Sequence, residues 1–246
     1  MSFPEKDFDA PANNSLVDEF GRHHTDLRIS VTDRCNLRCG YCMPLEASFM
    51  SQQRLLTYDE VARCANVASE MGIQTIRLTG GEPLMRPRLD QLIEQLTQLP
   101  KIQEVALTTN GLLLADQAAG LARAGLSRLN VSLDSLDEAR FEKIARRSGL
   151  QRILEGLEEA RRQGFRSIRM NAVSIRGLTE QDIVPLAEFC RTHCFHLRFI
   201  EFMPLDGDQA WQNQQVFTGV MLREIIEKKF GSLTPVYRER SSQPAT

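Results

Sequence analysis

Three cysteines lie within eight positions of each other in the segment DRCNLRCGYCMP, residues 33–44. Cys35, Cys39 and Cys42 are spaced C-x3-C-x2-C, and the next cysteine along the chain is Cys64. A structural zinc site or an ordinary four-iron cluster takes four protein ligands. Three thiolates can instead hold three irons of a four-iron cluster and leave the fourth iron open, which is typical of a catalytic metal site. Such an iron can chelate a molecule through an amine and a carboxylate.

A second motif, RLTGGEPL at residues 77–84, follows the cysteines. Gly80 and Gly81 allow a backbone to approach a ligand closely, and Glu82 supplies a carboxylate for an ammonium group. Taken from the residues alone, each motif has a simpler interpretation. The cysteines could form a zinc site completed from elsewhere or be incidental buried thiols, and the glycines could form a plain turn.

Short β-branched runs alternate with helical patterns along the chain. We expect strands at residues 27–32, 73–80, 104–111, 128–134, 167–175 and 196–203. We expect helices at residues 57–72, 86–99, 114–125, 150–164, 180–194 and 218–231. Strict alternation predicts an α/β fold with a parallel sheet, because parallel neighbours need crossover helices. Six units are fewer than the eight of a closed barrel, so we expect an open partial (β/α)6 TIM-like barrel, with a flat doubly wound sheet as the alternative.

In either architecture, chemistry gathers at the C-terminal ends of the strands. The cysteine loop follows the first expected strand and the GGEP segment follows the second. Asn110 ends the third expected strand, and Ser132 and Asp134 lie in the fourth. The sequence therefore predicts one functional site at this edge of the sheet.

The composition is that of an ordinary globular protein, with 246 residues, 25% charged residues and a formal net charge of −2. We expect a cytoplasmic protein that binds neither nucleic acid nor membranes. In such a chain, six cysteines indicate metal ligands or buried thiols rather than disulfides. We expect a flexible segment at residues 1–20, a core domain at residues 21–235 and a polar tail at residues 236–246.

The C-x3-C-x2-C loop with Tyr41 before its last cysteine resembles the radical S-adenosylmethionine (SAM) superfamily, and GGEP resembles that superfamily's element for the cofactor's amino group. The resemblance implies a [4Fe-4S] cluster whose open iron binds the methionine end of SAM. An electron from the cluster then cleaves the sulfonium, giving methionine and a 5′-deoxyadenosyl radical.

Longer segments resemble the family of molybdenum-cofactor biosynthesis protein A, a GTP 3′,8-cyclase, from about residue 18 to 233. They are FGRHHTDLRISVTDRCNLRCGYCMP (20–44), IRLTGGEPLMRPRL (76–89), LTTNGLLL (107–114), RLNVSLDSL (128–136) and LRFIEFMPLDGD (197–208). This resemblance implies a lyase that takes a hydrogen from C3′ of GTP, after which the sugar radical attacks C8 of guanine. The implied partners are GTP and a reducing electron donor, while a homodimer is left open.

Residue by residue, the resemblance assigns three groups. The implied cluster ligands are Cys35, Cys39 and Cys42, and the implied SAM contacts are Tyr41, Gly80, Gly81, Glu82, Ser132 and Met203. The implied GTP contacts are Arg28, Arg77, Thr108 and Arg169, the last at a position where the family usually has lysine. Guanidinium groups suit a triphosphate because their planar forks bind phosphate oxygens in pairs. Ordinary strand-end ion pairing is the alternative interpretation for Arg28 or Arg77.

The family also carries a second cluster, held by C-x2-C plus a distant cysteine in a C-terminal segment, and its tail ends in Gly-Gly. The sequence here ends in YRERSSQPAT with neither feature, so we expect a truncated chain. Two alternatives therefore stay open: a radical SAM enzyme of another substrate class, and a non-catalytic iron–sulfur scaffold. We interpret Cys190, Cys194 and His193 as thiols and a capping histidine rather than a metal site, and Cys64 as core packing.

Overall fold

The computed structural model describes residues 15–204 and 211–236, so the expectations for residues 1–14 and for the tail beyond residue 236 lie outside the described residues. The strands are β1 (Asp26–Ser30), β2 (Thr75–Thr79), β3 (Glu104–Thr109), β4 (Arg128–Ser132), β5 (Ile168–Ser174) and β6 (His196–Glu201). The α-helices are α1 (Tyr58–Glu70), α2 (Leu89–Thr97), α3 (Leu114–Arg123), α4 (Glu138–Ala145), α5 (Leu150–Arg162), α6 (Ile183–His193) and α7 (Gly219–Phe230). Four short 3-10 helices complete the set: η1 (Gln52–Arg54), η2 (Pro83–Met85), η3 (Glu180–Asp182) and η4 (Asn213–Gln215).

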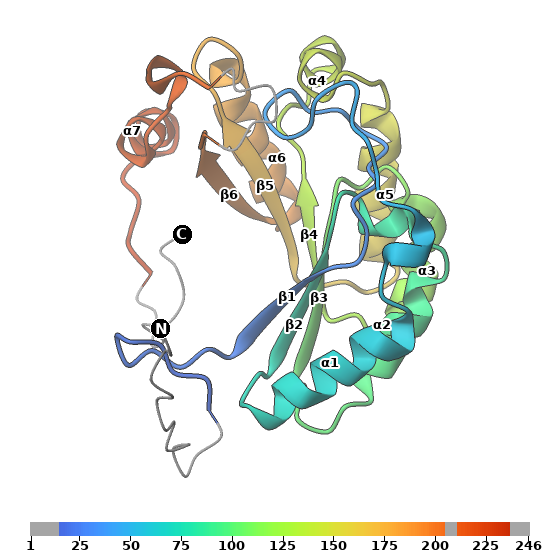
Figure 1. Cartoon of the computed structure of the whole chain (residues 1–246). Helices are drawn as coiled ribbons and strands as arrows, with labels where there is room; N and C mark the ends of the chain where they lie inside the picture. The colour runs from blue at the N-terminus through green and yellow to red at the C-terminus, as the bar shows by residue number, and fades with distance from the viewer. Residues whose placement is uncertain (1–14, 205–210, 237–246) are drawn as a thin grey trace, which may run out of the picture.

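The six strands form one sheet in the order β1-β2-β3-β4-β5-β6, and every neighbouring pair is parallel. A doubly wound sheet reverses its strand order at a switch point, and this sheet has no reversal. Figure 1 shows the sheet curving from β1 round to β6, with α1, α2, α3 and α5 along its outer side. The expected open partial barrel is therefore confirmed.

Alternation along the strands separates two faces of the sheet. In β2 the burial pattern alternates, with Ile76 and Leu78 fully buried and Arg77 between them only partly buried. The buried residues pack in one core with Leu92 and Leu121 of the helices. Because successive strand residues point to opposite faces, the residues between them face the inner, concave side of the sheet. Polar strand residues on that side do not pack in the core that the helices cover, so they can line a site.

One helix was not expected from the sequence. Helix α4 lies between β4 and α5, and its first turn is capped by the Asp137 side chain, which accepts a hydrogen bond from the Arg140 backbone N–H. The signal was a capping aspartate followed by helix formers. None of the helices in the described residues combines the length and apolar character that a membrane span requires.

Candidate functional site

The cysteine loop begins directly after β1 and packs against the end of α4. Backbone N–H groups of Arg38 and Gly40 donate to the carbonyls of Ala145 and Ile144, at 3.0 and 3.1 Å. Within the loop, the Cys42 N–H donates to the Cys39 carbonyl at 2.9 Å, which makes a tight turn. Cys35 and Cys39 are partly buried and Cys42 is exposed. The helix that sequence reasoning missed thus supports the loop that carries the cysteines.

The three thiols are close enough to influence one another's ionisation. Burial raises the pKa of Cys39 to about 12, and negative charge at Asp134, Cys42 and Cys35 adds to this effect. Burial also raises the pKa of Cys35 and of Cys42. Thiols of this kind are protonated near neutral pH until a bound metal displaces the protons.

The three cysteines of the loop suit a cluster in which each thiolate binds its own iron. No three His, Cys, Asp or Glu side chains among the described residues are grouped tightly enough to hold one metal ion. In a four-iron cluster each thiolate binds a different iron, so the ligands need only surround the cluster. Three neighbouring thiols from one loop meet that requirement and leave one iron without a ligand from the loop.

The GGEP segment packs directly on the backbone that leads into the cysteine loop. The N–H groups of Gly81 and Glu82 donate to the carbonyls of Thr32 and Arg34, each at 2.7 Å. A Cβ on Gly80 would lie 2.3 Å from the Thr32 oxygen, and a Cβ on Gly81 would lie 2.3 Å from the Arg34 oxygen. Any side chain would force the two segments apart, so the glycines are required for this contact between the segments that follow β1 and β2.

The Glu82 carboxylate is fully buried and accepts hydrogen bonds from this chain. Its Oε1 accepts from the Thr109 hydroxyl at 2.7 Å and the Leu84 N–H at 2.9 Å, and its Oε2 accepts from the Asn110 N–H at 2.6 Å. Desolvation raises the pKa of Glu82, while these donors oppose that rise. The carboxylate therefore joins the GGEP segment to the end of β3. From the sequence, the same carboxylate was expected to face an ammonium group.

Tyr41 connects the cysteine loop to the C-terminal ends of β4 and β5. Its hydroxyl donates to Oδ2 of Asp134 at 2.7 Å, and Oδ1 of Asp134 accepts from the Val173 N–H at 2.7 Å. Burial raises the pKa of Asp134 to about 6. Ser132 lies partly buried at the end of β4, and Met203, beyond β6, is 50% exposed.

The inner face below this rim carries arginines from several strands. Arg28 of β1 lies opposite Arg77 of β2 in the strand register. Arg77 in turn lies opposite Ala106 of β3, which lies opposite Arg128 of β4, so these residues form one row across the sheet. Arg169 lies on β5, where burial and then Arg128 and Arg198 lower its pKa to about 10. Burial lowers the pKa of Arg77, and Arg128 and Arg28 lower it further.

Positive charge is concentrated on this face, and the nearby Asp26 and Glu104 offset only part of the effect of the neighbouring arginines on the pKa of Arg77. The structure brings Arg28, Arg77 and Arg169 together with Arg128, which is paired to Glu104 at 2.7 Å. Thr108 lies on the same face, where its hydroxyl accepts from the Asn130 amide at 3.4 Å. Arg128 and Arg198 were not predicted from the sequence; the strand register places Arg128 opposite Ala106 and Arg198 opposite Asn171.

Other cysteines lie away from the loop. Cys190 is buried with its sulfur 3.4 Å from that of Met170, and His193 is hydrogen-bonded through Nδ1 to its own helix at Phe189. The expectation for Cys64 was wrong, because this residue is exposed on α1. The buried residues of α1, Val61, Ala65 and Ser69, follow a spacing of four, and Cys64 lies off that stripe.

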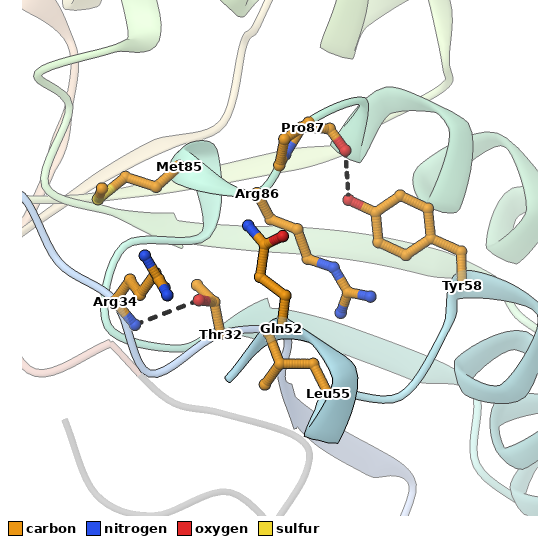
Figure 2. A pocket seen from close by; sticks show the side chains of 8 residues that line it. All are labelled: Thr32, Arg34, Gln52, Leu55, Tyr58, Met85, Arg86 and Pro87. Carbon is orange, nitrogen blue, oxygen red and sulfur yellow. Dashed lines mark hydrogen bonds between the residues drawn. The ribbon is translucent and has the colours of Figure 1, made fainter. Parts of the chain in front are cut away.

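A pocket of about 290 Å³ lies beside the segment that enters the cysteine loop, and Thr32 and Arg34 of that segment help to line it. Figure 2 shows its lining: Thr32, Arg34, Gln52, Leu55, Tyr58, Met85, Arg86 and Pro87. The Arg86 guanidinium lies 4.3 Å from the Tyr58 ring centroid and donates to the Val31 carbonyl at 2.8 Å. These contacts fasten the end of β1 to α1. The cysteines do not line this pocket.

Known proteins with similar sequences place this chain in a family. Residues 29–190 match the sequence pattern of the Radical SAM superfamily. The chain is 49% identical over 233 residues to GTP 3′,8-cyclase of Rhodopirellula baltica, covering 94% of this chain and 65% of that protein. It is 40% identical to GTP 3′,8-cyclase of Thermodesulfovibrio yellowstonii, covering 92% of this chain and 70% of that protein.

A likeness in structure extends to more distant proteins. The crystal structure of methylornithine synthase superposes with a TM-score of 0.64 at 14% identity, covering 85% of this chain and 63% of that one. At this identity the likeness concerns the fold alone. With the superfamily pattern over residues 29–190 and the close relatives, the chain belongs to the radical SAM superfamily and, within it, to the family of proteins named GTP 3′,8-cyclase.

Proposed function

We propose that this chain is the radical SAM core of a GTP 3′,8-cyclase in molybdenum-cofactor biosynthesis. The observation that carries the proposal is the arrangement of one concave face, where a three-thiol loop lies at the C-terminal rim and repelling arginines lie below it. The thiols suit a cluster that must bind one further ligand at its open iron. The arginines suit a polyanion, because their planar guanidinium forks bind phosphate oxygens in pairs.

In this proposal Cys35, Cys39 and Cys42 hold a [4Fe-4S] cluster. Such a cluster would supply the electron that cleaves bound SAM into methionine and a 5′-deoxyadenosyl radical, the species that would take the hydrogen from C3′ of GTP. Tyr41, Gly80, Gly81, Ser132 and Met203 are proposed SAM contacts, as is Glu82 through its place in the GGEP segment. Arg28, Arg77, Thr108 and Arg169 are proposed contacts of GTP.

The chain's own residues contribute alignment and charge. The Tyr41–Asp134 hydrogen bond fixes the cysteine loop relative to β4 and β5. The arginines would neutralise the triphosphate and thereby fix the ribose relative to the rim, since hydrogen abstraction needs the reacting atoms in a narrow geometry. Because those guanidinium groups already repel one another, a triphosphate would relieve the repulsion as well as add contacts.

A deuterium-transfer experiment tests the proposal. The protein is reconstituted anaerobically with iron and sulfide, then mixed with SAM, a strong reductant and GTP deuterated at C3′. We expect 5′-deoxyadenosine carrying one deuterium, detected by mass spectrometry. ATP deuterated at C3′ is the matched control, and it should yield less labelled product.

Each result separates the candidate functions. Unlabelled 5′-deoxyadenosine formed at the same rate with and without GTP would contradict GTP as the substrate. It would still show that the chain is a radical SAM enzyme, of another substrate class. A fully loaded cluster that produces no 5′-deoxyadenosine would contradict enzymatic function and favour the iron–sulfur scaffold.

A further inference from the structure

Asn110 lies directly after β3, and its side chain reaches the cysteine loop. Its amide nitrogen Nδ2 is 2.8 Å from Oδ1 of Asn36 and 3.8 Å from the sulfur of Cys35. The orientation of the amide is determined by its other end, because Oδ1 accepts the Leu112 backbone N–H at 3.1 Å. An N–H can only donate, so the nitrogen of Asn110 must face Cys35.

A second donor reaches the same sulfur. The Leu37 backbone N–H donates to the Cys35 sulfur at 3.4 Å. Cys35 and Asn110 are both partly buried, and polar contacts in a partly desolvated site are stronger than in water. The sulfur of Cys35 is therefore placed between two N–H donors, one from its own loop and one from the end of β3.

Glu82 holds Asn110 in this position. Its carboxylate accepts the Asn110 backbone N–H at 2.6 Å and the Thr109 hydroxyl at 2.7 Å. The Glu82 backbone N–H in turn donates to the Arg34 carbonyl, one residue before Cys35. The GGEP segment thus fixes both the loop that carries the sulfur and the residue that donates to it.

We propose that Asn110 is a positioning residue whose amide donates a hydrogen bond to the Cys35 sulfur and thereby raises the reduction potential of the bound cluster. This inference rests on the proposed function, since it requires a cluster ligated by Cys35. Reduction adds one electron to the cluster and breaks no bond. Hydrogen bonds to ligand sulfurs help to set cluster potentials. A donor stabilises the more negative, reduced state more strongly, so its loss disfavours reduction.

The test is a redox titration of the full chain, reconstituted with iron and sulfide and monitored by EPR without SAM or GTP. Asn110→Leu keeps the approximate size of the side chain and removes the donor. We expect its iron content to match wild type and its ratio of reduced to oxidised cluster at a fixed potential to fall about tenfold. For a one-electron couple that ratio corresponds to a potential lower by about 59 mV.

The matched control is Gln117→Leu. The Gln117 amide lies on α3 and donates to the Leu84 carbonyl at 3.0 Å, so its loss should leave the potential unchanged. An Asn110→Leu protein with a full cluster and the wild-type potential would overturn the inference. An equal shift in both variants would also overturn it.

Two further measurements cover a variant that fails to load. Asn110→Asp keeps the shape of the side chain and the acceptor for Leu112, and its potential should fall further because a negative charge faces the sulfur. In the unaltered protein, asparagine labelled with 15N in its amide should show a weak nitrogen coupling to the reduced cluster in pulsed EPR, and absence of that coupling would refute the contact. Wild-type protein that binds no cluster would instead refute the proposed function.

Discussion

The Tyr41 hydroxyl donates a 2.7 Å hydrogen bond to the Asp134 carboxylate across 93 residues of sequence. The same carboxylate accepts the Val173 N–H, so one buried side chain joins the cysteine loop to the ends of β4 and β5. Buried polar groups must be hydrogen-bonded to avoid a large desolvation cost. This relationship therefore stabilises the position of the cysteine loop relative to the ends of β4 and β5.

The first prediction concerns pH. Burial raises the pKa of Asp134 to about 6 from its ordinary value of 3.8, so the folded protein binds this proton more tightly than the unfolded chain does. The free energy of unfolding should therefore contain a contribution that is lost as pH rises from about 4 to about 6, totalling about 3 kcal/mol. Asp134→Asn should lack this contribution.

The measurement is urea unfolding of the metal-free protein at several pH values between 4 and 7. As pH rises from 4 to 7, the unfolding free energy of wild type should decrease relative to that of Asp134→Asn. Parallel curves for the two proteins would show that Asp134 titrates near its ordinary pKa.

The second prediction concerns the cluster ligands. Replacing Cys35, Cys39 or Cys42 by alanine should abolish the four-iron cluster, because each thiolate serves a separate iron. Cys64→Ala and Cys194→Ala are matched controls, since both side chains are exposed and lie outside the loop. Iron and sulfide content with an EPR spectrum of the reduced protein gives the readout. A normal cluster without Cys39, or loss of the cluster without Cys194, would show that the ligand assignment is wrong.

The third prediction concerns Glu82. Glu82→Ala leaves two backbone N–H groups and the Thr109 hydroxyl without their acceptor in a buried site. Each unsatisfied buried donor costs about 1–3 kcal/mol, so the metal-free protein should lose at least about 3 kcal/mol of unfolding free energy. Urea denaturation measures this loss. Glu155→Ala, at an exposed position on α5, should change stability by no more than about 0.5 kcal/mol.

This prediction also distinguishes two roles for Glu82. A residue that only contacted SAM would leave the stability of the metal-free protein unchanged after substitution by alanine. Unchanged stability together with weaker SAM binding would therefore favour the interpretation suggested by the sequence over the buried network seen in the structure.

The fourth prediction concerns the inner-face arginines. Arg28→Ala and Arg77→Ala should each weaken GTP binding about tenfold or more, since a hydrogen bond to a charged group contributes about 1.5–3 kcal/mol. Wild-type affinity should fall as salt rises, and less steeply in the variants. Arg169→Lys keeps the charge and should bind GTP more tightly than Arg169→Ala. Calorimetry at several salt concentrations measures these effects.

A basic residue on the outer side gives the control for charge alone. Arg152 is exposed on α5 and pairs with Asp116 at 2.7 Å, so Arg152→Ala should leave GTP binding unchanged. An equal loss of affinity in Arg152→Ala and Arg77→Ala would mean that net charge, rather than the inner face, attracts the nucleotide.

The sequence by itself determined the class of fold and the meeting of the cysteine loop with the GGEP segment. Alternating β-branched runs and amphipathic helices require parallel crossovers, and the parallel strands brought the cysteine loop and the GGEP segment to one edge. The spacing of Cys35, Cys39 and Cys42 is a local property that the chain fixes without the help of distant residues. The expected strands overran the observed ones; the one expected at residues 104–111 ends at Thr109, where the backbone turns toward Glu82.

Only the tertiary structure decided which distant groups meet. Glu82 accepts hydrogen bonds from Thr109 and Asn110 at the end of β3, and Tyr41 donates to Asp134 just after β4. No periodic pattern in the sequence encodes such pairs. Arg128 and Arg198 joined the inner face because strand register, set by packing of the whole sheet, put them beside Arg77 and Arg169. The role of each residue as ligand or support thus depends on burial and hydrogen bonding, which arise only when the sheet has curved and its helices have packed.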